Sequence, residues 1–149
     1  MLRYLAFSLL MFLNGCYACT SNLFSESNLH CQGEACAIDY NGAKNLILEI
    51  PTHIKKLSIS YNGSGQVVLH KSGAHLENLD LQCIGSAIVD LRGVPAKKAK
   101  IKYRGSADLK LNASEIIDID YRGSGDVEIE GGAKINKQGN GSGKIITSW

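Results

Sequence analysis

The segment Ile117-Asp-Ile-Asp-Tyr-Arg-Gly-Ser-Gly-Asp-Val-Glu-Ile-Glu130 holds one complete copy of a phrase that recurs through this 149-residue chain. Its centre, Tyr-x-Gly-Ser-Gly/Ala, returns with small changes, and its first glycine falls at positions 42, 63, 85, 105, 123 and 141. The steps between copies are therefore 21, 22, 20, 18 and 18 residues. A near-constant period of this length is typical of stacked repeat folds, which present extended surfaces.

The residues around each glycine alternate between apolar and polar. Before the glycine, Ile117, Ile119 and Tyr121 occupy every second position, and Val127 and Ile129 resume the alternation after it. A period of two indicates strands with one buried face. Glycine allows neighbouring backbones to approach closely, so we interpret the Gly-Ser-Gly step as a corner between two strands of each repeat.

Two all-β architectures fit this repeat. We predict a single-stranded parallel β-helix, or solenoid, of about five to six rungs with 18 to 22 residues per rung. Parallel stacking explains why like residues recur at like positions, such as Arg104 with Arg122 and Asp108 with Asp126. The alternative is an antiparallel β-sandwich built from hairpins, because Asn-Gly pairs are common hairpin turns.

The pattern hydrophobic-x-hydrophobic-x-Tyr-x-Gly-Ser-Gly-Asp-Val, clearest in residues 117–130, resembles the head GIN domain. This bacterial domain is catalogued as an auto-transporter adhesin head and as a domain of unknown function. The resemblance covers about residues 36–149 and implies a β-solenoid in an extracytoplasmic setting with an adhesin-like role. It brings no catalytic residues with it. The chain departs from the pattern at Gln66, Ile88 and Lys144, which replace the Asp after the corner.

The N-terminus predicts export. Residues 1–15 combine an early Arg3 with the apolar stretch Tyr4–Leu13, which is typical of a signal peptide and too short to span a membrane. Leu13-Asn-Gly-Cys16 resembles a lipobox, so Cys16 is expected to carry lipid and to anchor the protein to a membrane. The alternative is cleavage after Ala18, which would release a periplasmic or secreted protein.

The expected organisation is a signal peptide at 1–15, a tether and cap at 16–35, and a solenoid at 36–149. Tyr17 follows the lipobox where an inner-membrane retention signal would have Asp, which favours the outer membrane. Without Arg3 the chain has 15 basic residues, one fewer than the full 16, against 14 acidic ones, which argues against nucleic-acid binding. The basic run at Lys97, Lys98, Lys100 and Lys102 is interpreted as solvated lysines at rung edges, which discourage aggregation.

Four cysteines remain if Cys16 is lipidated. Exported proteins can keep disulfides, and we predict one between Cys31 and Cys36 that staples the N-terminal cap. Cys83 occupies a tyrosine position of the repeat, so it is expected as a small buried side chain, with pairing to Cys19 as the alternative. Neither a metal nor a cofactor is predicted.

Asp108 and Asp126 form the strongest candidate for chemistry, with Asp90 expected nearby. One rung apart, two carboxylates would lie about 5 Å from each other. Such a pair could bind Ca²⁺ or act in glycoside hydrolysis, so an envelope polysaccharide-active enzyme is the alternative function. The leading interpretation of this surface column is solvated strand residues that keep the face soluble.

The leading functional hypothesis is a non-enzymatic envelope lipoprotein whose strand faces bind a glycan, an envelope protein or a second copy of the chain. The tyrosines at the corners are expected as an interior ladder with hydroxyls reaching outward, and a sugar-stacking platform is the alternative. Self-association is suggested by Ile145–Trp149, which offers no polar cap and so predicts an open edge for Trp149 or a partner to cover.

Overall fold

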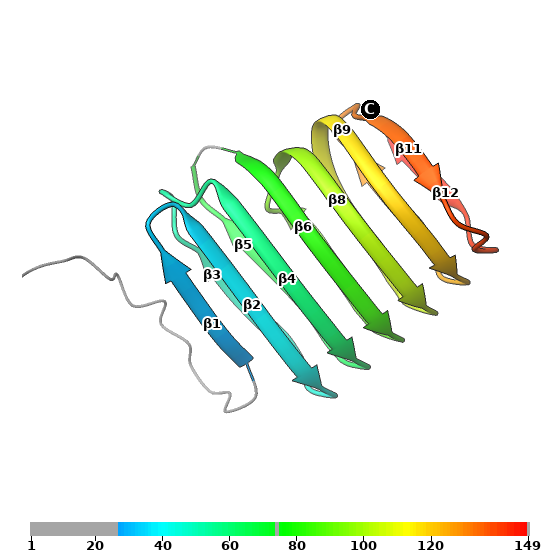
Figure 1. Ribbon diagram of the computed structural model, residues 1–149, viewed down its shortest axis with the longest axis horizontal. Coiled ribbons are helices and arrows are strands. Elements are labelled where there is room, and N and C mark those ends of the chain that lie inside the picture. Colours follow the sequence, from blue (N-terminus) through cyan, green and yellow to red (C-terminus); the bar gives the residue numbers. More distant parts are fainter. Residues whose placement is uncertain (1–26, 74, 149) are drawn as a thin grey trace, which may run out of the picture.

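The computed structural model describes residues 27–73 and 75–148, and every regular element in them is a β-strand. The strands form a parallel β-solenoid of about six turns (Figure 1). The predicted signal peptide, Cys16, Cys19 and Trp149 lie outside the described residues. The strands are β1 (Ser27–Gln32), β2 (Ala35–Gly42), β3 (Leu46–Ile50), β4 (Lys56–Gly63), β5 (Gln66–Lys71), β6 (Leu76–Gly85), β7 (Ile88–Gly93), β8 (Ala96–Gly105), β9 (Asp108–Gly123), β10 (Val127–Glu130), β11 (Lys134–Gln138) and β12 (Ile145–Ser148).

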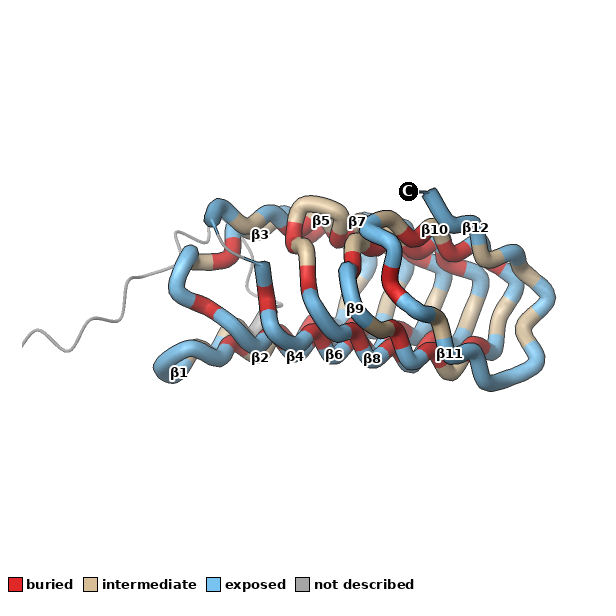
Figure 2. Tube along the Cα trace, turned by 90° about the horizontal axis from the view of Figure 1, so that it is seen from above, coloured by how far each residue is buried: buried red, intermediate tan, exposed pale blue. Residues whose placement is uncertain are grey.

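Two sheets run along the solenoid and face each other across the core (Figure 2). Sheet A has the order β1-β2-β4-β6-β8-β9-β11, and sheet B has the order β3-β5-β7-β9-β10-β12. The long strand β9 contributes its first part to sheet B and its second part to sheet A. Apart from the β1–β2 pair, these strand pairs are parallel. The parallel β-helix prediction is therefore confirmed, and the antiparallel sandwich is wrong.

The strand register reproduces the period of the sequence. Tyr40 pairs with Tyr61, Tyr61 with Cys83, Cys83 with Tyr103, and Tyr103 with Tyr121. The corner glycines pair in the same way, from Gly42 to Gly123. Because side chains alternate along a strand, this register puts one apolar column after another into the core. Among the described residues, no polar or charged residue is fully buried.

The corner brings the backbones of successive rungs into direct contact. The amide of the corner serine donates a hydrogen bond to the glycine carbonyl of the rung before, as from Ser106 to Gly85 at 3.0 Å and from Ser124 to Gly105 at 3.0 Å. A Cβ on Gly105 would lie 1.9 Å from the carbonyl oxygen of Gly85, and Gly105 also has φ +142°. Glycine is therefore required there by both space and backbone conformation.

An antiparallel hairpin covers the N-terminal edge of sheet A. β1 turns through Gly33, with φ +59°, and pairs with β2 so that Cys31 lies opposite Cys36. The two Cα atoms are 4.1 Å apart and a disulfide joins the side chains. Closing this hairpin covalently holds a strand over an edge that would otherwise offer unpaired backbone groups.

The last described rung carries polar and small residues at positions that are apolar in the rung before. Lys137 pairs with Ile119, and Thr147 pairs with Ile129. The ammonium of Lys137 lies 5.2 Å from the ring centroid of Tyr121, where a cation–π contact covers the end of the aromatic column. Polar residues of this kind are typical of the terminal repeats of solenoids. Among the described residues, β11 pairs only with β9 and β12 only with β10, so the outer edge of the last rung has no further strand, and its coverage by Trp149 or a partner stays a prediction.

Replacing Gly105 by Ala should destabilise the protein by about 2 kcal/mol or more, because the new Cβ meets the Gly85 carbonyl oxygen and the positive φ is strained. The matched control is Ser106→Ala, which keeps the backbone donor and removes only an exposed hydroxyl, so its effect should stay within about 0.5 kcal/mol. Urea unfolding followed by circular dichroism measures both changes. Equal stability of the two variants would contradict the role given to the corner.

Candidate functional site

The tyrosine column is part of the core and not a ligand platform. Tyr61, Tyr103 and Tyr121 are at most 1% exposed. The rings of Tyr103 and Tyr121 stack with centroids 5.1 Å apart and planes 9° from parallel. Tyr40 and Tyr61 stack in the same way at 5.2 Å, and Cys83 separates the two pairs. The interior ladder expected from the sequence is therefore present.

The tyrosine hydroxyls do not reach outward as expected. The Tyr103 hydroxyl donates to the backbone carbonyl of Ala107 at 2.6 Å, four residues further along the chain. Tyr121 donates to the carbonyl of Gly125 in the same manner, and Tyr61 accepts a hydrogen bond from the amide of Gly65. Each hydroxyl thus ties the inner side of the corner together, because a buried phenol requires a polar partner.

Burial shapes the acid–base properties of this column. It raises the pKa of Tyr103 to about 12, with a smaller contribution from the neighbouring Tyr121. Burial likewise raises the pKa of the Cys83 thiol to about 11. Cys83 is free and fully buried, and its protonated thiol at neutral pH fits a packing role rather than a reactive one.

Asp108 and Asp126 connect successive rungs. One carboxylate oxygen of Asp108 accepts a hydrogen bond from the amide of Asp126 at 3.0 Å, and Asp126 accepts one from the amide of Lys144 at 2.9 Å. Asn45 does the same for the amide of Gln66 with its side-chain oxygen. An amide oxygen thus replaces the carboxylate without loss of the contact, which points to hydrogen-bond acceptance as the role of this column.

Asp90 lies on the strand next to Asp108 but does not join its column, because Ile88 pairs with Asp108 and Asp90 pairs with Lys110. It lies in another column of sheet B, where its carboxylate makes a two-point contact with Arg92 at 2.6 and 3.0 Å. The hydrogen bonds from Arg92 hold the pKa of Asp90 below its ordinary value. Residues 27–73 and 75–148 contain no group of three or more His, Cys, Asp or Glu side chains that could hold a metal ion.

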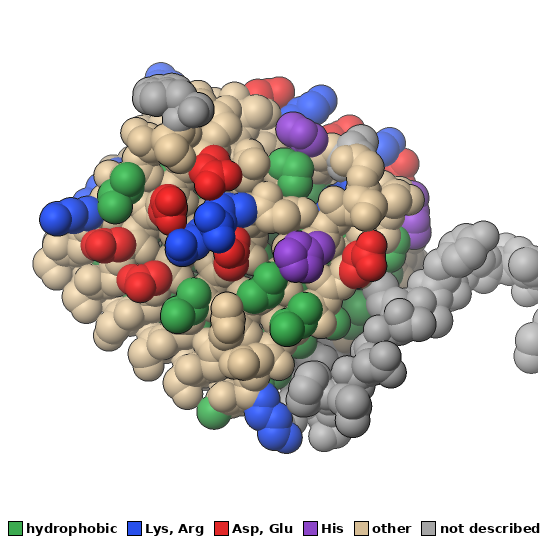
Figure 3. Space-filling view, turned by 180° about the vertical axis from the view of Figure 1, so that it is seen from behind, with side chains coloured by type: hydrophobic (Ala, Val, Ile, Leu, Met, Phe, Trp, Pro, Cys, Tyr) green, Lys and Arg blue, Asp and Glu red, His purple; other side chains and the backbone are tan. Residues whose placement is uncertain are grey.

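The outer face of sheet B balances its own charges. Arg92 also lies 3.8 Å from Glu130, and Lys110 pairs with Glu128 at 3.2 Å. Figure 3 shows acidic and basic side chains intermingled on one face of the molecule, with hydrophobic side chains beside them. Ile47 and Ile88, which are 67% and 48% exposed, belong to this face. These ion pairs neutralise part of the charge on this face.

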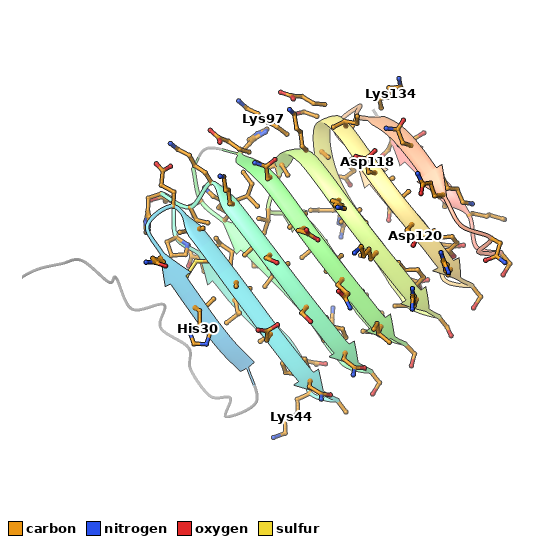
Figure 4. The ribbon with its side chains drawn as sticks, in the orientation of Figure 1. His30, Lys44, Lys97, Asp118, Asp120 and Lys134 are labelled. Atoms are coloured by element: carbon orange, nitrogen blue, oxygen red, sulfur yellow. A yellow bond between two sulfur atoms is a disulfide. The ribbon has the colours of Figure 1, made fainter. Side chains whose placement is uncertain are left out.

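The outer face of sheet A contains an open hollow of about 1060 Å³ that crosses β1, β2, β4, β6, β8 and β9. His30 on β1 and Asp118 on β9 line its two ends (Figure 4). Between them the lining mixes short outward side chains, such as Ala37 and Ser58, with the long side chains of Lys56, Lys98 and Lys100. The strands that form its floor pair in register.

Two lysines of the basic run, Lys98 and Lys100, line this hollow. Lys98, Lys100, Lys102 and Arg104 occupy successive outward positions of β8. Because β8 lies between β6 and β9, these lysines are on a central strand, and their interpretation as edge residues is wrong. Sequence reasoning missed the hollow, although the alternation that assigns Ala37, Ser58 and Asn78 to the outer face was an available signal.

One comparison with known proteins finds a family to which the chain is similar. A family model described as "Putative auto-transporter adhesin, head GIN domain" matches residues 20–133. No curated protein and no solved structure matches the chain. A search of the described residues finds no helix long and apolar enough to cross a membrane.

Substitutions at Asp108 should distinguish a hydrogen-bond acceptor from a catalytic or metal-binding carboxylate. Asp108→Ala removes the acceptor of the Asp126 amide and should lower the free energy of unfolding by about 1 kcal/mol. Asp108→Asn keeps an oxygen acceptor, as Asn45 does in its own rung, and should change stability much less. Chemical denaturation measures both variants, and equal losses would show that the charge itself is what matters.

Tyr103→Phe should reveal the buried phenol through its pH dependence. Because the folded pKa of about 12 exceeds the ordinary value of 10.0, the phenol stabilises the fold fully below pH 10 and loses this contribution as pH rises towards 12. At neutral pH the variant should be less stable than the wild type by about 1 kcal/mol, since one buried hydrogen bond is missing. That difference should shrink between pH 10 and 12 in denaturation curves, and a constant difference would contradict the assignment.

Proposed function

Since the chain belongs to the head GIN family, we propose that it is a non-enzymatic envelope lipoprotein whose solenoid displays a binding surface. The family description supports an adhesin-like head domain of a bacterial cell-surface or envelope protein. The finer elements of the proposal are the lipid on Cys16 and the use of the outer face of sheet A for binding. The outer membrane is the favoured location because Tyr17 follows the lipobox.

One observation carries the proposal: the residues that define the repeat are already engaged in holding the rungs together. The corner glycines contact the carbonyls of the rung before, the tyrosine hydroxyls bind the corner backbone, and Asp108 and Asp126 bind backbone amides. What varies from rung to rung is the outward column on each sheet. A solenoid of this kind presents such columns as one continuous face, and exposed faces are where repeat proteins bind partners.

The alternative of a polysaccharide-active enzyme has less support. Glycoside hydrolysis requires two carboxyl groups that are both available to the sugar, with one of them protonated. Asp108 and Asp126 are exposed, and each already accepts a backbone hydrogen bond. This arrangement supports a structural role for both side chains as connectors between rungs. Together with the family description, it favours the binding function over the enzymatic one.

Cys16→Ser should prevent lipidation. The precursor is then expected to keep residues 1–15 or to be cut elsewhere, and the protein should no longer carry acyl chains that hold it to the membrane. Membrane fractionation and mass spectrometry of the N-terminus measure these changes. Cys19→Ser is the matched control and should remain lipidated and membrane-bound. Unchanged processing and fractionation of Cys16→Ser would contradict the lipoprotein assignment.

A photo-crosslinking amino acid at Ser58, on the outer face of sheet A, should capture an envelope component in intact cells. The same amino acid at Gln66, exposed on the sheet B side, is the control and should give much less product. Mass spectrometry and glycan staining identify what is captured. A crosslink from Gln66 alone would show that the binding face is wrong, and no crosslink from either position would contradict the proposed role in the envelope.

A further inference from the structure

The hollow on sheet A combines three features that define what could occupy it. It is elongated across the strands, because residues from β1 through β9 line it. It mixes apolar side chains, such as Ala37 and Ile116, with the neutral polar Ser58 and Asn78. Lys56, Lys98 and Lys100 also line it, together with the carboxylates of Asp80 and Asp118. An occupant must therefore be extended, must present apolar and polar groups close to each other, and must offer anionic groups to several lysines.

These three lysines differ from the ion-paired cations of sheet B. On sheet B, Arg92 and Lys110 are neutralised by acidic neighbours at 2.6 and 3.2 Å. Within the described part of the chain, Lys56, Lys98 and Lys100 have no carboxylate within ion-pair distance. Asp80 and Asp118 flank Lys100 in the ladder without forming such a pair. Ammonium groups left available beside a hollow complement an anionic ligand.

The ladder also sets the distance between these charges. Lys56 pairs with Asn78, and Asn78 pairs with Lys98, so the two lysines are two strands apart in one column. Strands lie about 4.8 Å apart, which separates the two Cα atoms by about 10 Å along the solenoid axis. That distance is comparable to the length of a disaccharide in an extended glycan. Lys100 lies two residues along β8 from Lys98, about 7 Å away.

We propose that the hollow binds an acidic polysaccharide, which lies along the solenoid axis with its carboxylates on Lys56, Lys98 and Lys100. Ser58 and Asn78 hydrogen-bond sugar hydroxyls, and Asp80 and Asp118 accept hydrogen bonds from others. The apolar CH edges of the sugar rings lie against Ala37 and Ile116. This inference rests on the proposed binding function and names the ligand class of the same face.

A membrane surface fits these observations less well. A flat anionic bilayer would meet the protruding side chains and would leave the floor of the hollow, with Ala37 and Ser58, unfilled. A chain of sugars is narrow enough to enter it, and its hydroxyls match neutral polar groups that a phosphate surface does not require. The glycan therefore uses both the charge and the shape of the hollow.

The test uses the double variant Lys98→Gln/Lys100→Gln and a control of equal charge loss, Lys134→Gln/Lys144→Gln, whose exposed side chains lie outside the hollow. The probes are a short oligogalacturonate and its methyl ester, which has the same length and no charge. Full-length wild-type protein should bind the acid form and bind the ester at least tenfold more weakly. The hollow variant should weaken binding of the acid form about tenfold, and the control less than twofold.

Binding should also weaken as salt is raised, because exposed charges are screened. Equal weakening by both variants, equal binding of acid and ester, or no binding of the acid form would overturn the proposal. Vesicles containing phosphatidylglycerol form a separate arm: binding to them that depends on Lys98 and Lys100, without glycan binding, would also overturn it in favour of a membrane-docking face. Thermal unfolding of each variant verifies that the fold is intact.

The two proposals fail separately. If Ser58 crosslinks an envelope component while the lysine variants bind oligogalacturonate normally, the binding face stands and the acidic-glycan assignment falls. If Ser58 captures nothing in cells and the purified protein still distinguishes the acid from the ester, the ligand class stands and the envelope role requires revision.

Discussion

The structure depends on the hydrogen bond between a corner serine amide and the glycine carbonyl of the rung before. This contact forms only when two backbones approach so closely that a Cβ has no room, and a Cβ on Gly105 would lie 1.9 Å from the carbonyl of Gly85. A slip of one residue would put a side chain there and would also turn the apolar face of the strand to solvent. The corner therefore fixes the register of every rung, and the columns of like residues follow from it.

The two ends of the stack require residues that differ from the repeat, because a terminal rung has a neighbour on one side only. Each inner rung is covered on both sides, whereas a terminal rung leaves backbone groups and apolar side chains uncovered. Sheet A is covered at the first rung by a hairpin that the Cys31–Cys36 disulfide closes. At the other end, Lys137 and Thr147 replace apolar residues of the column. Both devices depart from the repeat, and both occur where neighbours are missing.

The two faces of the solenoid have different chemistry although the same repeat generates them. On sheet B, Arg92 and Lys110 are paired with acids, so the charges mainly stabilise one another. On sheet A, Lys56 on β4 and Lys98 and Lys100 on β8 line an open hollow without a carboxylate in ion-pair distance among the described residues. A family of adhesin-like head domains is consistent with a scaffold whose specificity lies in such outward residues rather than in its repeated motif.

The amino-acid sequence by itself determined the solenoid, because the period of about 20 residues and the alternation around each glycine leave few ways to bury the apolar positions. It also indicated the cap closed by a disulfide, because its two cysteines lie close together in the sequence. It indicated the buried tyrosine column, because the tyrosines recur with the period of the repeat. Only the tertiary structure decided that the Tyr103 hydroxyl turns inward to Ala107, that Asp108 and Asp126 bind amides of the next rung, and that Lys98 lies on a central strand beside a hollow. Those outcomes depend on which residues face one another across rungs and on the relative lengths of neighbouring side chains, which spacing along one chain does not specify.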